Sequence, residues 1–189
     1  VMNTLQPGLC VLGTRLPGCF NVFEMSVRAV LGQQITVKAA STLAARLVAV
    51  YGTQVQTGIE GLTHSFPAPA AILALGENIS EHLGKLGIIS ARANTIYQLA
   101  RVLADEKNDF GFCGNPEEEM QKLQAIRGIG SWTAQYIAMR AMGWPDAFLP
   151  TDAGIKKALP DHTPKELQVL SEAWRPWRSY ATVNLWNTL

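Results

Sequence analysis

Two glycines and one carboxylate are the residues of this chain whose types and spacing best fit a chemical role. Gly128 and Gly130 bracket one apolar residue between two helical patterns, and Asp152 follows after a further loop. Such a glycine pair lets the chain reverse tightly and leaves unpaired backbone N–H groups where the second helix begins. These N–H groups and the helix dipole favour an anion. The pattern therefore indicates a phosphate site, although a plain helix–turn–helix connection would carry the same two glycines.

The longer pattern around these residues resembles the helix-hairpin-helix DNA glycosylase superfamily. It reads Leu-x-x-Ile-x-Gly-Ile-Gly-x-x-Thr-Ala from Leu123 and Leu-Pro-x-Asp from Leu149. Within the superfamily, the chain is most similar to the alkylation-repair branch of 3-methyladenine DNA glycosylase II, from about Leu16 to the C-terminus. The resemblance implies an all-α, two-lobed fold with a DNA-binding and base-binding cleft between the lobes. It also implies a single domain over 1–189, with the hairpin at about 117–142.

The resemblance assigns DNA contacts to the hairpin and to an earlier loop. The backbone at Gly128 and Gly130 would bind a phosphate without reading sequence, and the hydroxyls of Ser131 and Thr133 would add contacts. In this family the residue after Leu-Gly-Gln fills the gap that a flipped base leaves in the duplex. That residue is Gln34 here, where close relatives can have leucine. A polar wedge can hydrogen-bond the widowed base but fills the gap with less apolar surface.

A monovalent cation, Na⁺ or K⁺, is a further implication of the resemblance. The backbone carbonyls of Gln124, Ile126 and Ile129 would hold it, and carbonyl oxygens at a tight turn suit a hard cation. No other cofactor is expected. Some relatives carry an iron–sulfur cluster on four clustered cysteines, a spacing that this chain lacks. Its cysteines are scattered and form no CxxC pair: Cys10, Cys19 and Cys113.

Asp152 stands where the family places its catalytic aspartate. Breaking an N-glycosidic bond builds positive charge on the sugar, which a fixed carboxylate in a dry cleft stabilises. The carboxylate can also position or deprotonate the attacking water. For an arbitrary aspartate, the simpler interpretation would be a cap on the helix that begins at Ala153. Asp146, directly after a proline, is interpreted as turn chemistry.

Three aromatic residues are predicted to form a base pocket. Trp132 and Tyr136 lie four residues apart on the second hairpin helix and share a face, and Trp186 matches a pocket aromatic of the alkylation-repair branch. A cationic alkylated purine is attracted to ring faces by stacking and cation–π interactions, about 0.5–2 kcal/mol per contact. The remaining tryptophans are expected in the core: Trp144, Trp174 and Trp177.

The residue at position 132 also distinguishes reaction types. Bifunctional members of the superfamily carry a lysine there, which attacks the sugar as a Schiff-base nucleophile. Trp132 cannot form that adduct, so we expect a monofunctional glycosylase for alkylated purines without strand-cleaving lyase activity. Two alternatives remain: a non-catalytic hairpin module that only docks on DNA, and a glycosylase that acts on other damaged bases.

Composition sets the outer limits. The 189 residues have a formal net charge of +1, so charge alone says nothing about DNA. No apolar run approaches the roughly 18 residues that a bilayer span needs, and scattered cysteines fit a reducing compartment. Composition thus gives no sign of a membrane protein. The resemblance adds the expectation of a monomer in the bacterial cytoplasm, associated with the nucleoid, that acts on double-stranded DNA and not on membranes. Close relatives often have an extra N-terminal subdomain, so the chain can be a C-terminal fragment of something longer.

Periodicity predicts helices throughout and no strand. The expected helices include Phe20–Leu31 and Thr36–Tyr51, whose inward stripes begin at Phe20 and Val37, followed by Pro69–Leu75 and Glu81–Leu86. Ser80, Ser90, Asn115 and Thr163 are predicted N-caps. A final helix is expected to restart at Pro176. Basic residues that could touch phosphates, or simply face solvent, are Arg28, Lys38 and Arg92.

Overall fold

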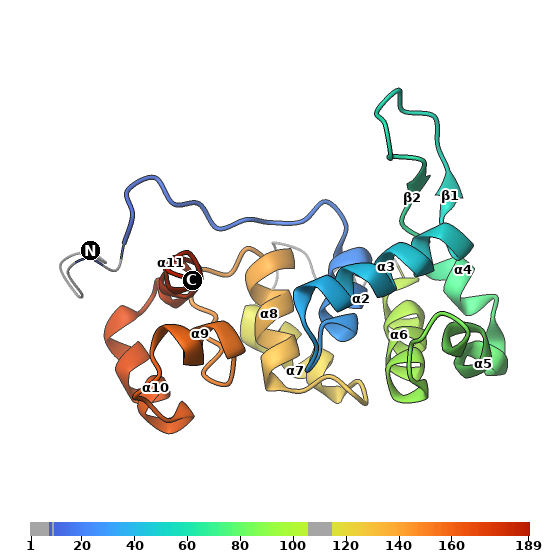
Figure 1. The fold of residues 1–189 in the computed structure, drawn as a ribbon. Helices are drawn as coiled ribbons and strands as arrows, with labels where there is room; N and C mark the ends of the chain where they lie inside the picture. Colours follow the sequence, from blue (N-terminus) through green and yellow to red (C-terminus); the bar gives the residue numbers. More distant parts are fainter. Residues whose placement is uncertain (1–7, 9, 106–114) are drawn as a thin grey trace.

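The computed structural model describes residues 8, 10–105 and 115–189, which fold into helices and one short β-hairpin (Figure 1). The α-helices are α2 (Val22–Leu31), α3 (Val37–Tyr51), α4 (Pro69–Leu73), α5 (Ile79–Gly84), α6 (Ser90–Leu103), α7 (Pro116–Ala125), α8 (Ser131–Ala141), α9 (Ala153–Ala158), α10 (Pro164–Ser171) and α11 (Arg178–Trp186). Two 3₁₀ turns, η1 (Gly76–Asn78) and η2 (Glu172–Trp174), precede α5 and α11. The all-α prediction is confirmed. Residues 106–114, which include Cys113, lie outside the described residues.

A two-stranded hairpin contradicts the prediction that the chain has no strand. β1 (Thr53–Gln54) pairs antiparallel with β2 (His64–Ser65). Strands of two residues are too short for an alternating pattern to be readable in the sequence.

Two apolar residues predicted to face the core are exposed. The side chain of Asn21 accepts a hydrogen bond from the backbone N–H of Glu24, so α2 begins after Phe20 and leaves that ring in solvent. Val37, in the first turn of α3, is 84% exposed. Only Ala44 and Leu47 of α3 are buried, because this helix covers the molecule with a narrow face near its C-terminal half.

Helix starts were predicted with mixed success. Asn115 and Thr163 cap α7 and α10 as expected, the latter with a complete capping box. Ser80 and Ser90 are not caps, since both lie inside the helices that they were expected to precede. Because η1 directly precedes α5, this helix begins at Ile79, two residues before the predicted start at Glu81. The last helix begins at Arg178, two residues after the predicted restart at Pro176.

The buried apolar residues form two clusters. The larger one is built mainly by α2, α5, α6, α7 and part of α8, and the smaller one by the segment before α9 together with α9, α10 and α11. α8 supplies both, with Ile137 in the first cluster and Met139 in the second. Trp174 is buried as predicted, whereas Trp177 is 38% exposed. No described helix is both long and apolar enough to cross a membrane.

Asp146 is the centre of a buried ion pair, which the interpretation as a simple turn missed. Its carboxylate accepts hydrogen bonds from Arg178 Nε at 2.8 Å and Nη2 at 2.9 Å. Arg178 Nη2 also donates to the backbone carbonyl of Asp146 at 2.8 Å, and Arg175 forms a further ion pair with this carboxylate. The pair fastens the start of α11 to the loop after α8, and α11 carries Trp186.

Candidate active site

The two hairpin glycines differ in backbone conformation and in the space around them. Gly128 has a φ of +94°, and a Cβ there would lie 2.0 Å from Thr95 Oγ1. Gly130 has an ordinary φ of −89° and no atom within 4 Å of its ideal Cβ position. It caps α8 without a side-chain hydrogen bond and is exposed, as Ser131 is. The N-terminus of α8 is therefore exposed, and the binding of a phosphate there stays a prediction.

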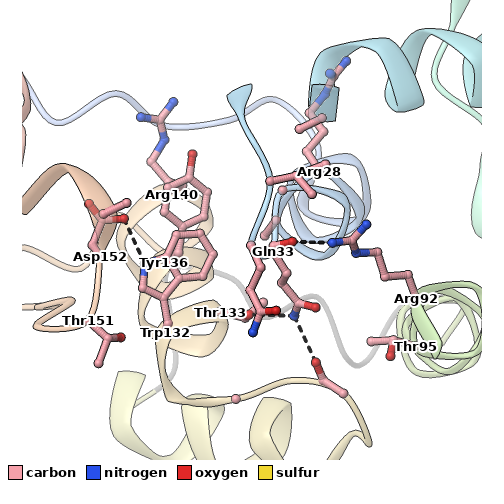
Figure 2. A pocket seen from close by; sticks show the side chains of 18 of the residues that line it. Arg28, Gln33, Arg92, Thr95, Trp132, Thr133, Tyr136, Arg140, Thr151 and Asp152 are labelled. Carbon is pink, nitrogen blue, oxygen red and sulfur yellow. Dashed lines mark hydrogen bonds between the residues drawn. The ribbon is translucent and has the colours of Figure 1, made fainter. Parts of the chain in front are cut away.

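Asp152 is the N-cap of α9 and is also bound by two tryptophans. Its Oδ1 accepts from the backbone N–H groups of Gly154 at 2.9 Å and Ile155 at 3.1 Å. Trp186 Nε1 donates to the same oxygen at 2.8 Å. Trp132 Nε1 donates to Oδ2 at 3.0 Å (Figure 2). The half-buried Asp152 carboxylate therefore caps α9 and also lies in the aromatic site.

The three predicted pocket aromatics lie together. The rings of Trp132 and Tyr136 are stacked, with centroids 5.2 Å apart and an interplanar angle of 8°. Trp186 lies 6.3 Å from Tyr136 at 50°. Arg140 Cζ lies 5.9 Å from the Tyr136 ring, so Trp132, Tyr136 and Arg140 form one row along α8 (Figure 2). The stacked Trp132 ring therefore covers one face of Tyr136.

The predicted wedge residue is exposed on a loop that the hairpin holds in place. Gln34 has a φ of +55° and lies between α2 and α3. Its neighbour Gln33 donates from Nε2 to Gly128 O at 3.0 Å and to Thr133 Oγ1 at 2.9 Å. Arg92 donates to the backbone carbonyl of Gln33 (Figure 2). Thr133 is buried, so the observed contact of its hydroxyl is internal, and its contact with DNA stays a prediction.

Of the predicted cation ligands, Ile126 and Ile129 lie at the turn between α7 and α8, and Gln124 lies in the last turn of α7. The carbonyl of Ile126 accepts a hydrogen bond from the N–H of Ile129 at 3.0 Å and keeps a second lone pair. The described residues contain no cluster of three or more His, Cys, Asp or Glu side chains that could hold a metal. A cation at this turn would therefore depend on carbonyl oxygens.

Most of the predicted site residues line one groove of about 2370 Å³: Gln34, Ile126, Gly128, Gly130, Trp132, Thr133, Tyr136, Asp152 and Trp186. Ser131, Gln124 and Ile129 are not among its lining residues. Among its described lining residues Asp152 is the sole acid, and six are basic: Arg28, Arg92, Lys122, Arg127, Arg140 and Lys156. Arg28 is paired with Glu24 at 2.7 Å, and Lys122 with Glu119 at 2.7 Å. Basic side chains thus gather along the groove of a chain that is nearly neutral overall. Composition could not reveal this distribution. That the groove separates two lobes stays a prediction.

Several residues of the groove had no role in the sequence-based prediction. Arg140 continues the four-residue spacing of Trp132 and Tyr136, and that spacing could have identified it. Gln33 and Gly154 make contacts across the fold that no local pattern encodes.

Comparisons with known proteins agree on one family. Residues 27–178 match the family described as "HhH-GPD superfamily base excision DNA repair protein". DNA-3-methyladenine glycosylase 2 of Escherichia coli K12 is 38% identical over 187 residues, which cover 99% of this chain and 63% of the relative. A Mycobacterium tuberculosis protein, "Probable bifunctional transcriptional activator/DNA repair enzyme AlkA", is 42% identical over 182 residues, covering 94% of this chain and 35% of the relative. The chain thus spans less than two thirds of the length of either curated relative.

A solved structure gives the same picture. The 3-methyladenine DNA glycosylase of Archaeoglobus fulgidus superposes with a TM-score of 0.76 at 26% identity, covering 90% of this chain and 58% of that one. The family match over residues 27–178 includes the segment that carries the hairpin.

Proposed function

Since the chain belongs to the HhH-GPD superfamily of base excision DNA repair proteins, we propose that it is a DNA glycosylase that removes alkylated purines of the 3-methyladenine type. The observation that carries the proposal is the half-buried Asp152 carboxylate, held by Trp132 and Trp186 in a groove whose other charged side chains are all basic among the described residues. A carboxylate among rings suits a reaction in which positive charge develops on the sugar. The rings suit an electron-poor base.

The reaction proceeds on a nucleotide turned out of the duplex. The open N-terminus of α8 binds a backbone phosphate, and Gln34 enters the space that the base leaves. As the glycosidic bond breaks, its electron pair leaves with the base, and Asp152 stabilises the cationic sugar until water attacks. A base that is already cationic leaves without a protonating acid. With Trp132 in place of a lysine, hydrolysis is the whole reaction, and no Schiff base forms.

The proposed substrate is double-stranded DNA that contains damaged bases, bound by a monomer in the cytoplasm. The charge on the groove supports a nucleic acid partner, because the basic side chains lie where phosphates would pass. A Na⁺ or K⁺ ion held by the carbonyls of Gln124, Ile126 and Ile129 would bridge the hairpin to a phosphate oxygen. No step of the chemistry depends on that ion.

Base release from methylated duplex DNA tests the proposal. The wild-type chain, Asp152→Asn and the exposed control Asp161→Asn are compared, and strand cleavage is scored separately. We expect wild type and control to release 3-methyladenine without cleaving the strand, and Asp152→Asn to lose release while still binding DNA. Equal, negligible release by all three with binding intact would instead identify a docking module. Strand cleavage without alkaline treatment of the DNA would identify a bifunctional enzyme.

A further inference from the structure

We propose that Trp132 and Trp186 position the Asp152 carboxylate through their indole N–H groups, and that Gly154 makes the room this arrangement needs. The proposal rests on the proposed function, and it gives the two tryptophans a task beyond presenting ring faces to a base. It makes them, with Gly154, positioning residues for the glycosidic bond cleavage.

The hydrogen bonds on Asp152 are unequally divided between its two oxygens. Oδ1 accepts three, from Gly154 N, Ile155 N and Trp186 Nε1. The one bond recorded for Oδ2 is from Trp132 Nε1. Capping of α9 therefore fixes where Oδ1 lies, whereas the rotation of the carboxylate plane depends on the indole of Trp132.

Trp132 is itself held in the orientation that makes this bond. Its ring face is stacked on Tyr136 at 5.2 Å, so its edge remains to donate to Asp152. Trp186 comes from α11, whose start is fastened by the buried pair of Asp146 and Arg178. Asp152 is thus fixed by donors from α8 and α11 as well as from its own helix. A carboxylate fixed before the reaction stabilises charge without reorganising as that charge develops.

Gly154 is required for space. A Cβ at this position would lie 2.7 Å from Trp186 Cδ1, 2.9 Å from Trp186 Nε1 and 3.1 Å from Asp152 Oδ1. An alanine would therefore displace the indole from the carboxylate. The backbone of Gly154 is helical, so alanine would otherwise be favoured there.

The test replaces each indole by a ring without a donor. Trp132→Phe and Trp186→Phe keep an aromatic face and lose the N–H, and Trp177→Phe, on the exposed turn before α11, is the matched control. Two duplexes probe the carboxylate: one with a pyrrolidine abasic-site mimic, which is cationic, and one with a tetrahydrofuran mimic, which is neutral. The ratio of their Kd values reports how strongly Asp152 stabilises a positive charge at the sugar position. Single-turnover base release and Tm are measured alongside.

Loss of one charge-assisted hydrogen bond corresponds to a change of roughly tenfold. We expect each pocket variant to lower both the preference for the cationic duplex and the release rate by about that factor, with tetrahydrofuran affinity within about twofold of wild type. In an Asp152→Asn background, Trp132→Phe should not lower the preference further, because the N–H acts through the carboxylate. Gly154→Ala should behave as Trp186→Phe does in both the preference and the release rate.

The outcomes separate this inference from the proposed function. If wild type neither releases bases nor prefers the cationic duplex, the function fails. If wild type does both and Asp152→Asn loses both, but the phenylalanine variants and Gly154→Ala keep the preference, the positioning role is wrong and the rings act by stacking alone.

Discussion

The side-chain amide of Gln33 donates to the carbonyl of Gly128 at 3.0 Å, across 95 residues of sequence. The same nitrogen donates to Thr133 Oγ1, and Arg92 binds the backbone carbonyl of Gln33. The loop that presents Gln34 and the turn that presents the phosphate site are therefore one connected unit. A wedge residue and a phosphate site that are joined in this way would keep a fixed spacing along the duplex.

Replacing the donor of that connection should reduce activity more than stability. Gln33→Glu places a carboxylate oxygen against the Gly128 carbonyl, so the loop is pushed from the hairpin. We expect base release in single turnover to fall roughly tenfold, the effect of losing a hydrogen bond and adding a repulsion. Gln54→Glu, on exposed β1, adds the same charge elsewhere and is the control. Unchanged release in Gln33→Glu would mean that the wedge loop does not need this connection.

The two hairpin glycines should respond differently to alanine. Gly128→Ala combines a positive φ with a 2.0 Å clash against Thr95, so we expect a loss of roughly 2–4 kcal/mol in the free energy of unfolding. Gly130→Ala has space and an ordinary φ, and it should lose less than about 1 kcal/mol. Its effect should instead appear in DNA affinity, because the methyl group covers the open end of α8. Urea unfolding and duplex binding measure the two quantities, and a pair of variants with equal stability would contradict this assignment.

We expect the buried ion pair of Asp146 and Arg178 to contribute strongly to the free energy of unfolding. Asp146→Asn leaves the 5%-exposed Arg178 side chain with only the exposed Glu172 carboxylate, 3.3 Å from its Nη1, as a charge partner, and breaking a buried pair costs roughly 3–5 kcal/mol. Glu81→Gln breaks the exposed pair with Lys85 and should leave the unfolding midpoint unchanged. Urea unfolding of both variants makes the comparison. Similar midpoints would show that the buried pair is dispensable.

The capping box of α10 predicts a pH dependence. Hydrogen bonds from the Thr163 backbone N–H and hydroxyl lower the pKa of Glu166. A carboxyl with a lower pKa in the folded state stabilises it above the unfolded pKa, and this contribution is lost as pH falls through the folded pKa. Wild type should therefore have a higher Tm than Glu166→Gln at neutral pH, and the difference should vanish in acid. Glu60→Gln, in the exposed loop between β1 and β2, should show no such trend.

The sequence predicted what local rules determine and missed what depends on distant contacts. Helix order and the caps at Asn115 and Thr163 follow from short patterns, and the aromatic row follows from helical spacing. Phe20 and Val37 were misplaced because periodicity finds a stripe without showing whether another element covers it. The role of Gly154 depends on Trp186, 32 residues away, which only the fold brings close.

Arg140 should tune which bases the pocket accepts. Its guanidinium lies 5.9 Å from the Tyr136 ring, and its buried Nε has no hydrogen-bond partner among the described residues. A fixed cation in the groove opposes a cationic base and leaves a neutral one unaffected. Removing it should therefore favour 3-methyladenine over the neutral base hypoxanthine.

The variant Arg140→Met keeps the length and packing of the side chain without its charge. We expect the ratio of release rates, 3-methyladenine over hypoxanthine, to rise about fivefold, corresponding to a change of about 1 kcal/mol in Coulomb energy. Arg101→Met, on the exposed face of α6, removes a charge away from the groove and should leave the ratio unchanged. A ratio that falls in Arg140→Met would mean that Arg140 orders Tyr136 for stacking, and that its charge does not reach the base.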